Sequence, residues 1–118
     1  NLTGAFLCAR AALPAMKRRK QGRIINVASI SGTLGTPNLS AYNASKWGLI
    51  GLTKCIAEEC REHGVQCLSV SPGSTDTEMI KLTSFEPRMT AEDVAATIAW
   101  CASGAPAAMT GTNVEVFG

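Results

Sequence analysis

The sequence contains little charge and few aromatic side chains: charged residues make up 17% of the chain, aromatic residues 5%, and the formal net charge is +2. So small a net charge does not favour a nucleic acid or an anionic membrane as partner. No apolar stretch approaches the roughly twenty residues of a membrane span, and no signal peptide is apparent. We therefore expect a cytoplasmic chain with no nucleic-acid or membrane partner.

Metal-binding patterns are also missing. The chain has five cysteines but no C-x-x-C pair, and His63 is its single histidine, so we expect no metal site. The cysteines lie in apolar helical or strand contexts, which predicts small core or near-core residues in a reducing compartment. They are Cys8, Cys55, Cys60, Cys67 and Cys101.

Helical and extended patterns alternate along the chain. Helices are expected over residues 2–20, 41–63 and 90–103, and strands over 23–28, 65–70 and 112–117. Ser40 is the expected N-cap of the second helix, and Thr90 with Asp93 three residues later indicates a capping-box variant at the start of the third. Gly22 and Gly64 are expected to end the first and second helices. Because the strands are short and apolar, without alternating polar residues, we predict an α/β fold with a parallel sheet covered by helices on both faces.

One short segment has the composition of an acid-base site. Tyr42 and Lys46 are four residues apart, so on a helix they share one face. A free phenol is a poor proton exchanger at neutral pH, but a neighbouring cation favours the phenolate. Ser29 follows an apolar strand and could hold the oxygen of a carbonyl or alcohol while Tyr42 exchanges its proton. Redox chemistry at such a site needs a hydride partner.

Four elements in this order and spacing resemble the short-chain dehydrogenase/reductase family. They are Ser29, the Tyr42-x-x-x-Lys46 pair, the P-G-x-x-x-T segment at residues 72–77, and Asn1, which lies twenty-eight residues before Ser29. The resemblance is closest to the 3-oxoacyl-carrier-protein reductase type, on residues 22–27 and on the Pro-Gly pair.

The resemblance implies the C-terminal half of a doubly wound Rossmann fold, with three strands and three main helices. Residues 1–118 are then a partial domain, because the family's glycine-rich phosphate turn has no counterpart here. The residue that distinguishes NAD from NADP belongs to the missing half, so the resemblance implies one of the two without selecting it.

The family's roles fall on particular residues. Tyr42 is the implied general acid or base in interconverting a carbonyl and a secondary alcohol, Lys46 its cationic neighbour, Ser29 the ligand of the substrate oxygen, and Asn1 a holder of relay water. The implied cofactor-binding residues are Tyr42, Lys46, Pro72, Gly73, Thr75 and Thr77. The implied substrate is a small-molecule carbonyl or alcohol, free or carrier-bound, and the short segment between Thr77 and the third helix permits a bulky or carrier-bound one. A homodimer or homotetramer is also implied.

Two alternatives stay open at this point. The chain could be a catalytically inactive, truncated family member that acts as an interaction or structural chain through an unpaired sheet edge. A Ser/Lys hydrolase is the other, although no nucleophile elbow or S-x-x-K sequence is present. Arg10, Trp47 and Leu52 are candidates for either a subunit interface or the core.

Overall fold

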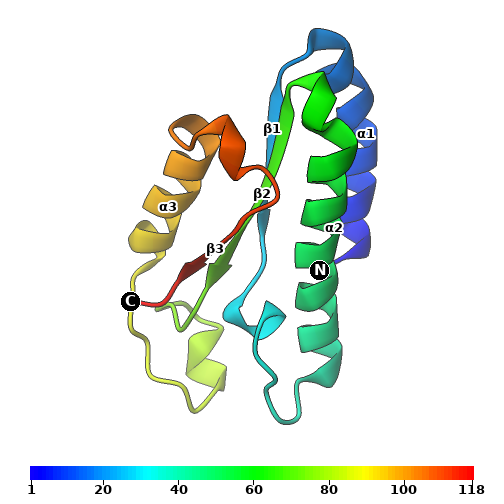
Figure 1. The fold of residues 1–118 in the computed structure, drawn as a ribbon. Coiled ribbons are helices and arrows are strands. Elements are labelled where there is room, and N and C mark those ends of the chain that lie inside the picture. Colours follow the sequence, from blue (N-terminus) through cyan, green and yellow to red (C-terminus); the bar gives the residue numbers. More distant parts are fainter.

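Three parallel strands form the centre of the protein, and the computed structural model describes all residues from 1 to 118 (Figure 1). The strands are β1 (Gly22–Val27), β2 (Val65–Pro72) and β3 (Asn113–Val116), in the order β1-β2-β3. The register pairs Asn26 with Ser69 and Ser69 with Asn113. The predicted parallel α/β sheet is therefore confirmed, with β2 as its central strand.

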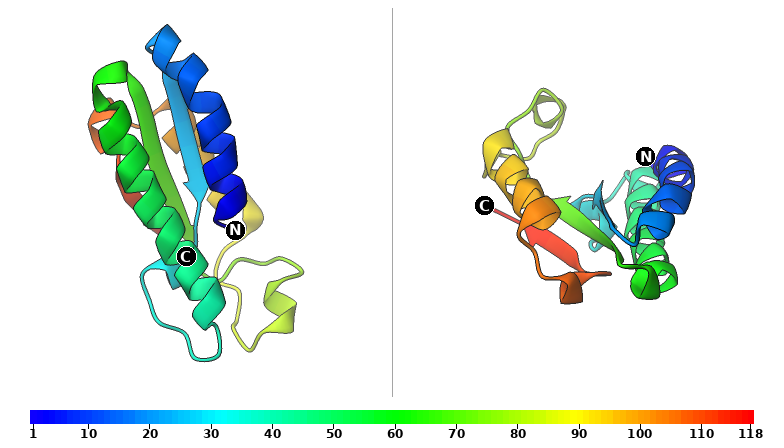
Figure 2. Two further views of the ribbon diagram at one scale, coloured as in Figure 1. Left: turned by 90° about the vertical axis from the view of Figure 1, so that its right-hand side faces the viewer. Right: turned by 90° about the horizontal axis from the view of Figure 1, so that it is seen from above.

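Helices cover both faces of this sheet. The helices α1 (Thr3–Arg19) and α2 (Ser40–Cys60) lie side by side over one face, and α3 (Ala91–Ser103) lies over the other (Figure 2). None of them combines the length and the apolar character that crossing a bilayer requires. Short 3-10 turns interrupt the connections, among them η1 (Ile30–Gly32) after β1 and η3 (Ile80–Leu82) after β2.

The main core lies between the sheet and the layer formed by α1 and α2. One buried cluster lies beside the amino ends of the strands and consists of Ala9, Ile56, Ala57, Cys60, Val65 and Cys67. A second cluster, formed by Ala28, Leu49 and Ile50, lies nearer the carboxyl ends, where Leu2 and Ala5 pack against it. This second cluster fixes α2 over the end of β1, where the candidate site is found.

The boundaries of α2 and β2 differ slightly from those expected. Leu39, not Ser40, is the N-cap of α2, and no side chain caps it, so the Ser40 prediction was wrong. The reason is that the Leu39 carbonyl already accepts a bond of 2.8 Å from the Asn43 amide, which starts the helix at Ser40. Gly64 ends the following 3-10 turn with φ 67°, as predicted. The strand β2 runs on to Pro72.

The end of α1 is formed differently from the prediction. Lys20, with φ 51°, is the left-handed residue that closes the helix, and Gly22 is already the first residue of β1. The Lys20 amide donates to the Lys17 carbonyl, and the Gln21 amide donates to the Met16 carbonyl. The assignment of the stop to Gly22 was therefore wrong, because backbone bonds complete the turn two residues earlier.

The start of α3 is a capping box, as its sequence indicated. Thr90 Oγ1 accepts a bond of 3.2 Å from the Asp93 amide, and the Asp93 carboxylate accepts one of 2.8 Å from the Thr90 amide. The bonds that the Thr90 amide and hydroxyl donate to the Asp93 carboxylate lower the pKa of Asp93 below its ordinary value, since they favour the charged form.

The cysteine prediction holds for three of the five residues. Cys60, Cys67 and Cys101 are buried, and desolvation raises the pKa of Cys67 to about 12. Cys8 and Cys55 are exposed, so describing them as core or near-core residues was wrong. They lie on the faces of α1 and α2 that turn away from the sheet, although their local sequence is as apolar as that of the buried three.

Candidate active site

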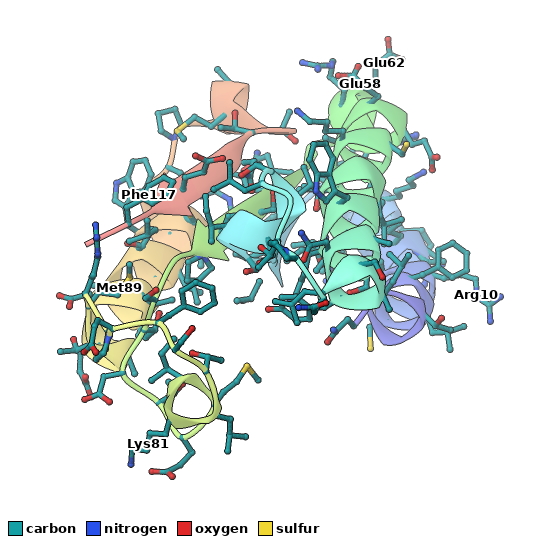
Figure 3. The ribbon with its side chains drawn as sticks, turned by 90° about the horizontal axis from the view of Figure 1, so that it is seen from below. Arg10, Glu58, Glu62, Lys81, Met89 and Phe117 are labelled. Carbon is teal, nitrogen blue, oxygen red and sulfur yellow. The ribbon has the colours of Figure 1, made fainter.

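The candidate site lies at the edge of the sheet where the parallel strands end. The turn that follows β1 carries Ser29, and the loop that follows β2 carries residues 73–90. Seen from below, Met89 and Lys81 lie on this second loop, to one side of the turn after β1, and α2 lies to the other side (Figure 3). Ligands of open α/β sheets bind at such an edge.

Lys46 is half-buried at the point where α2 crosses the end of β1. Its Nζ donates a bond of 3.0 Å to the Val27 carbonyl and lies 5.7 Å from the centroid of the Tyr42 ring. Partial burial lowers the pKa of Lys46 below its ordinary value, because desolvation disfavours the ammonium. The ammonium has three N–H donors, and only one of them is engaged within the protein.

Tyr42 lies in the first turn of α2 and is partly exposed. Its ring is within reach of the Lys46 ammonium, as the four-residue spacing predicted. The side chains of Tyr42 and Lys46 are therefore neighbours on one face of the helix. This face is the one that meets the end of β1, because Lys46 contacts the Val27 carbonyl there.

Ser29 has an extended backbone and caps the 3-10 turn η1. Its Oγ accepts a bond of 3.1 Å from the Ser31 amide, which fixes the hydroxyl oxygen at the strand end. The preceding residue, Ala28, still pairs with β2, since its amide donates to the Val70 carbonyl at 2.7 Å. Ser29 thus directly follows the last residue that pairs with β2, and its hydroxyl hydrogen is free to donate.

Asn1 contacts α2 within the Tyr42–Lys46 turn. Its Nδ2 lies 3.3 Å from Ser45 Oγ, and that hydroxyl donates a bond of 2.6 Å to the Tyr42 carbonyl. Hydrogen bonds therefore connect Asn1 through Ser45 to the helix turn that carries Tyr42 and Lys46. The sequence did not single out Ser45, although its place inside the motif was a usable signal.

The loop after β2 has free backbone donors. The Gly73 amide donates to the Val116 carbonyl at 2.8 Å, and the Asp76 amide to the Met89 carbonyl at 2.9 Å, so both ends of the segment are anchored. The amides of Thr75 and Thr77 donate to no acceptor in the protein. Two backbone donors and two threonine hydroxyls consequently lie along the stretch that follows Pro72.

Apolar side chains project from the remainder of this loop, around η3. The exposed fractions of Met79 and Leu82 are 69% and 88%, and that of Phe85 is 50%. Lys81 and Arg88 lie in the same segment. The loop therefore offers apolar surface beside the polar strand ends, a combination that suits a ligand with a polar head and an apolar part.

Two further residues connect the Ser29 turn to α2, and the sequence did not indicate either. A Cβ on Gly32 would lie 3.0 Å from the Lys46 carbonyl oxygen, so only glycine permits η1 to approach the helix this closely. Asn43 donates a bond of 2.8 Å from Nδ2 to the Leu34 carbonyl. Both positions follow from tertiary packing, although a glycine three residues after the strand-end serine was a visible signal.

Comparison with known proteins gives a consistent picture. A family model described as short chain dehydrogenase matches residues 1–87. The 3-oxoacyl-[acyl-carrier-protein] reductase of Synechocystis sp. is 39% identical over 128 aligned residues, which include 100% of this chain and 52% of that protein. The human (3R)-3-hydroxyacyl-CoA dehydrogenase is 40% identical and is matched over 50% of its length, again by all of this chain.

Solved structures agree with the sequence relatives. 4-Hydroxyisoleucine dehydrogenase complexed with NADH has a TM-score of 0.88 and 35% identity, with 100% of this chain and 55% of that chain covered. ElxO with NADP bound has a TM-score of 0.88 and 30% identity, with 98% and 52% covered. The chain thus spans about half the length of the relatives and structures that it matches.

Proposed function

Since the chain belongs to the short-chain dehydrogenase family, we propose that it carries the acid-base site of an NAD(P)-dependent oxidoreductase. The reaction would interconvert a carbonyl and a secondary alcohol. The observation that carries this proposal is the position of the Lys46 ammonium, which is held at the end of β1 beside the Tyr42 ring and has N–H donors that no protein acceptor engages.

Tyr42 is assigned the proton transfer. In the direction of reduction its hydroxyl donates a proton to the oxygen of the carbonyl as hydride reaches the carbon, and in oxidation the phenolate takes the proton back. The ammonium of Lys46 favours the phenolate by its charge. Its half-buried position strengthens that interaction, because the effective dielectric constant falls away from bulk water.

Ser29 and Asn1 are assigned supporting roles. Ser29 donates its free hydroxyl hydrogen to the substrate oxygen, and the bond from the Ser31 amide keeps Ser29 Oγ in place. Asn1 holds water near Lys46, so that protons reach the site from solvent. Its contact with Ser45 Oγ, at 3.3 Å, supports a position beside the Tyr42–Lys46 turn.

The donors at the strand ends suit a nicotinamide dinucleotide. Lys46 would bond the ribose hydroxyls with its unengaged N–H groups, and the free Thr75 and Thr77 amides would bond the carboxamide and the pyrophosphate. Pro72 and Gly73 would pass along the nicotinamide, and Tyr42 would share the ribose contact. The bound nicotinamide would supply or accept the hydride. NAD and NADP fit these residues equally.

We propose that residues 1–118 form the carboxyl-terminal half of one dinucleotide-binding domain. This agrees with the match to about half of each relative and with β1 being an edge strand here. A homodimer or homotetramer is part of the proposal. The interaction-only alternative gains nothing from the comparisons, because the relatives are named reductases and dehydrogenases.

For the substrate we propose a small carbonyl or alcohol compound, or an oxoacyl group on a carrier thioester. The named relatives include a reductase of acyl-carrier-protein substrates and a dehydrogenase of acyl-CoA substrates. The exposed apolar side chains of Met79, Leu82 and Phe85 would contact the apolar part of such a molecule.

The experiment is an assay of nicotinamide-dependent reduction of an acetoacetyl thioester by the wild-type protein and by Tyr42→Phe. The protein is used as isolated, and its intact mass shows whether further chain accompanies the 12.3 kDa described here. Loss of the proton donor should lower kcat by about 100-fold to 10,000-fold.

Trp100→Phe serves as the control, because Trp100 is a helical aromatic residue that is 46% exposed and lies on α3, not on the helix that carries Tyr42. We expect its kcat to stay within about twofold of wild type, as for other surface substitutions. Equal activity of Tyr42→Phe and wild type would refute the assigned mechanism.

A further inference from the structure

Asn43 connects two segments that the proposed mechanism requires to be close. It follows Tyr42 directly in α2, and its side chain is buried, with an exposed fraction of 8%. From there Nδ2 donates a bond of 2.8 Å to the carbonyl of Leu34, in the loop between η1 and α2. This bond joins the helix of Tyr42 to the segment that carries Ser29.

The segment between Ser29 and Leu34 is itself stiffened by hydrogen bonds. The Gly32 amide donates to the Ser29 carbonyl at 2.8 Å, and the amides of Thr33 and Leu34 donate to the Ile30 carbonyl at 2.9 and 3.0 Å. The Thr33 hydroxyl reaches the same carbonyl at 3.1 Å. A displacement of Leu34 is therefore transmitted to Ser29.

A second contact presses this turn against α2. A Cβ on Gly32 would be 2.6 Å from Ile50 Cδ1 and 3.0 Å from the Lys46 carbonyl oxygen, so backbone and helix are already in contact there. Gly32 thus limits how closely the turn approaches α2, while Asn43 prevents it from moving away. Together they determine the separation of Ser29 from Tyr42.

The other atom of the Asn43 amide shows what the residue contributes. Its Oδ1 is buried and has no hydrogen-bond partner in the protein, which is unfavourable for a polar atom. An apolar residue of the same size would avoid this cost. The contribution of asparagine at this position is therefore the bond from Nδ2 to the Leu34 carbonyl.

We propose that Asn43 is a positioning residue that holds the Ser29 hydroxyl at its working distance from the Tyr42 phenol. The proposal rests on the roles given above to Ser29 and Tyr42. Asn43 itself does not touch the reacting atoms in this mechanism. It acts through the Leu34 carbonyl and the turn behind it.

The test uses Asn43→Leu, which keeps the size of the side chain, removes the donor and removes the unpaired oxygen. Amide hydrogen exchange is followed by nuclear magnetic resonance at Gly32, Thr33 and Leu34. We expect exchange there to become about tenfold faster relative to β2 amides, because the turn opens locally. Asn43→Ala gives a second, smaller side chain in case the leucine variant folds poorly.

Asn26 offers a matched control. It is also an asparagine with an exposed fraction of 8%, but its Nδ2 bonds Thr53 Oγ1 at 2.9 Å in the core beneath α2. Asn26→Leu should leave the relative exchange of the Gly32, Thr33 and Leu34 amides unchanged. If the substitutions acted only by lowering global stability, exchange of the Gly32, Thr33 and Leu34 amides would become faster in both Asn43→Leu and Asn26→Leu.

Kinetics separate positioning from a merely structural role. Since a misplacement of about 1 Å can cost about 100-fold in rate, Asn43→Leu should lower kcat by about tenfold to 100-fold with KM within about twofold. The inference is overturned if the relative exchange rates of the Gly32, Thr33 and Leu34 amides do not change in Asn43→Leu. It is also overturned if exchange there becomes faster while kcat stays at the wild-type value. A failure of the proposed function would appear separately, as full activity of Tyr42→Phe.

Discussion

Two cations lie at opposite ends of β1, and their surroundings differ in a way that separates structure from function. Arg23 lies at the amino end of the strand and Lys46 lies over its carboxyl end, where Val27 is the last strand residue. Both side chains are partly buried, and both bond backbone carbonyls. The difference is in how many of their donors find partners.

Arg23 engages four of the five N–H donors of its guanidinium, one of them in a second bond from Nη2 to Gln66 Oε1. Nη1 donates to the Cys101 carbonyl at 2.7 Å, Nη2 donates to the Ala105 carbonyl at 2.9 Å, and Nε donates to Gln66 Oε1 at 2.8 Å. The partners come from β2 and from the end of α3, so one side chain joins three elements. A cation also suits the carbonyl end of a helix. Only one N–H, on Nη1, is left without an acceptor.

Lys46, by comparison, has few hydrogen-bond partners for its ammonium. One protein acceptor engages its ammonium, although the group is half-buried and its pKa is lowered by desolvation. A charge held in such surroundings for stability alone would be expected to have more partners. The amino end of the sheet is thus built for stability, while the carboxyl end retains unsatisfied donors, as the proposed ligand site requires.

Arg23→Met should give the largest effect on stability. It leaves the carbonyls of Cys101 and Ala105 and the amide oxygen of Gln66 without their donors, which should cost about 2–4 kcal/mol. The measurement is the free energy of unfolding in urea.

The control is Arg10→Met. Arg10 is exposed on α1 and lies 5.8 Å from the Phe6 ring, so we expect a change within about 0.5 kcal/mol. If Arg23→Met lowered the free energy of unfolding no more than Arg10→Met does, the hydrogen bonds of Arg23 at the amino end of the sheet would not be important for stability.

Lys46→Met should show the opposite profile, with a large effect on activity and a small one on stability. Removing the cation beside the phenol should lower kcat by about tenfold to 100-fold, which corresponds to about 1.4–2.7 kcal/mol in the activation barrier. The free energy of unfolding should change by less than about 1 kcal/mol, since a single bond to the Val27 carbonyl is lost.

Lys54→Met is the matched control, because Lys54 is an exposed lysine of the same helix with one long bond, 3.4 Å, to the Gly111 carbonyl. Its kcat should equal that of wild type. If Lys46→Met lowered the free energy of unfolding strongly but left kcat unchanged, Lys46 would serve stability and not activity. The inferred difference between the two ends of the sheet would then be wrong.

The sequence predicted local structure well, because local structure follows from local patterns. The apolar spacing of the helices, the Thr90–Asp93 capping box and the left-handed Gly64 were all visible in short windows of sequence, and all are found in the structure. The two errors at helix ends were also local, since Ser40 and Gly22 have the right composition for a cap and a stop but lie one or two residues from where backbone bonds begin and end the helices.

Long-range contacts could not be predicted in the same way. Arg23 lies 78 residues from Cys101 and 82 from Ala105 along the chain, and no spacing rule connects them. The Lys46 contact with the Val27 carbonyl and the Asn43 contact with the Leu34 carbonyl depend on how α2 crosses β1. The family resemblance selected Tyr42 and Lys46, while the contacts of α2 with the Val27 and Leu34 carbonyls became evident only from the packing.

The smallest expected effect is the pH dependence that Lys46 adds to stability. Partial burial lowers the pKa of Lys46 in the folded protein below that of an unfolded lysine. Between these two values the unfolded chain binds more protons, so the free energy of unfolding rises with pH across this window. Because Lys46 is also partly exposed, the total rise should stay below about 1 kcal/mol.

Urea unfolding of wild type and Lys46→Met through the alkaline range isolates the effect, since the other lysines contribute equally to both. Wild type should gain stability relative to the variant as the pH rises. A relative loss would mean that the folded protein favours the Lys46 ammonium, and the two cations would then not differ in the way inferred here.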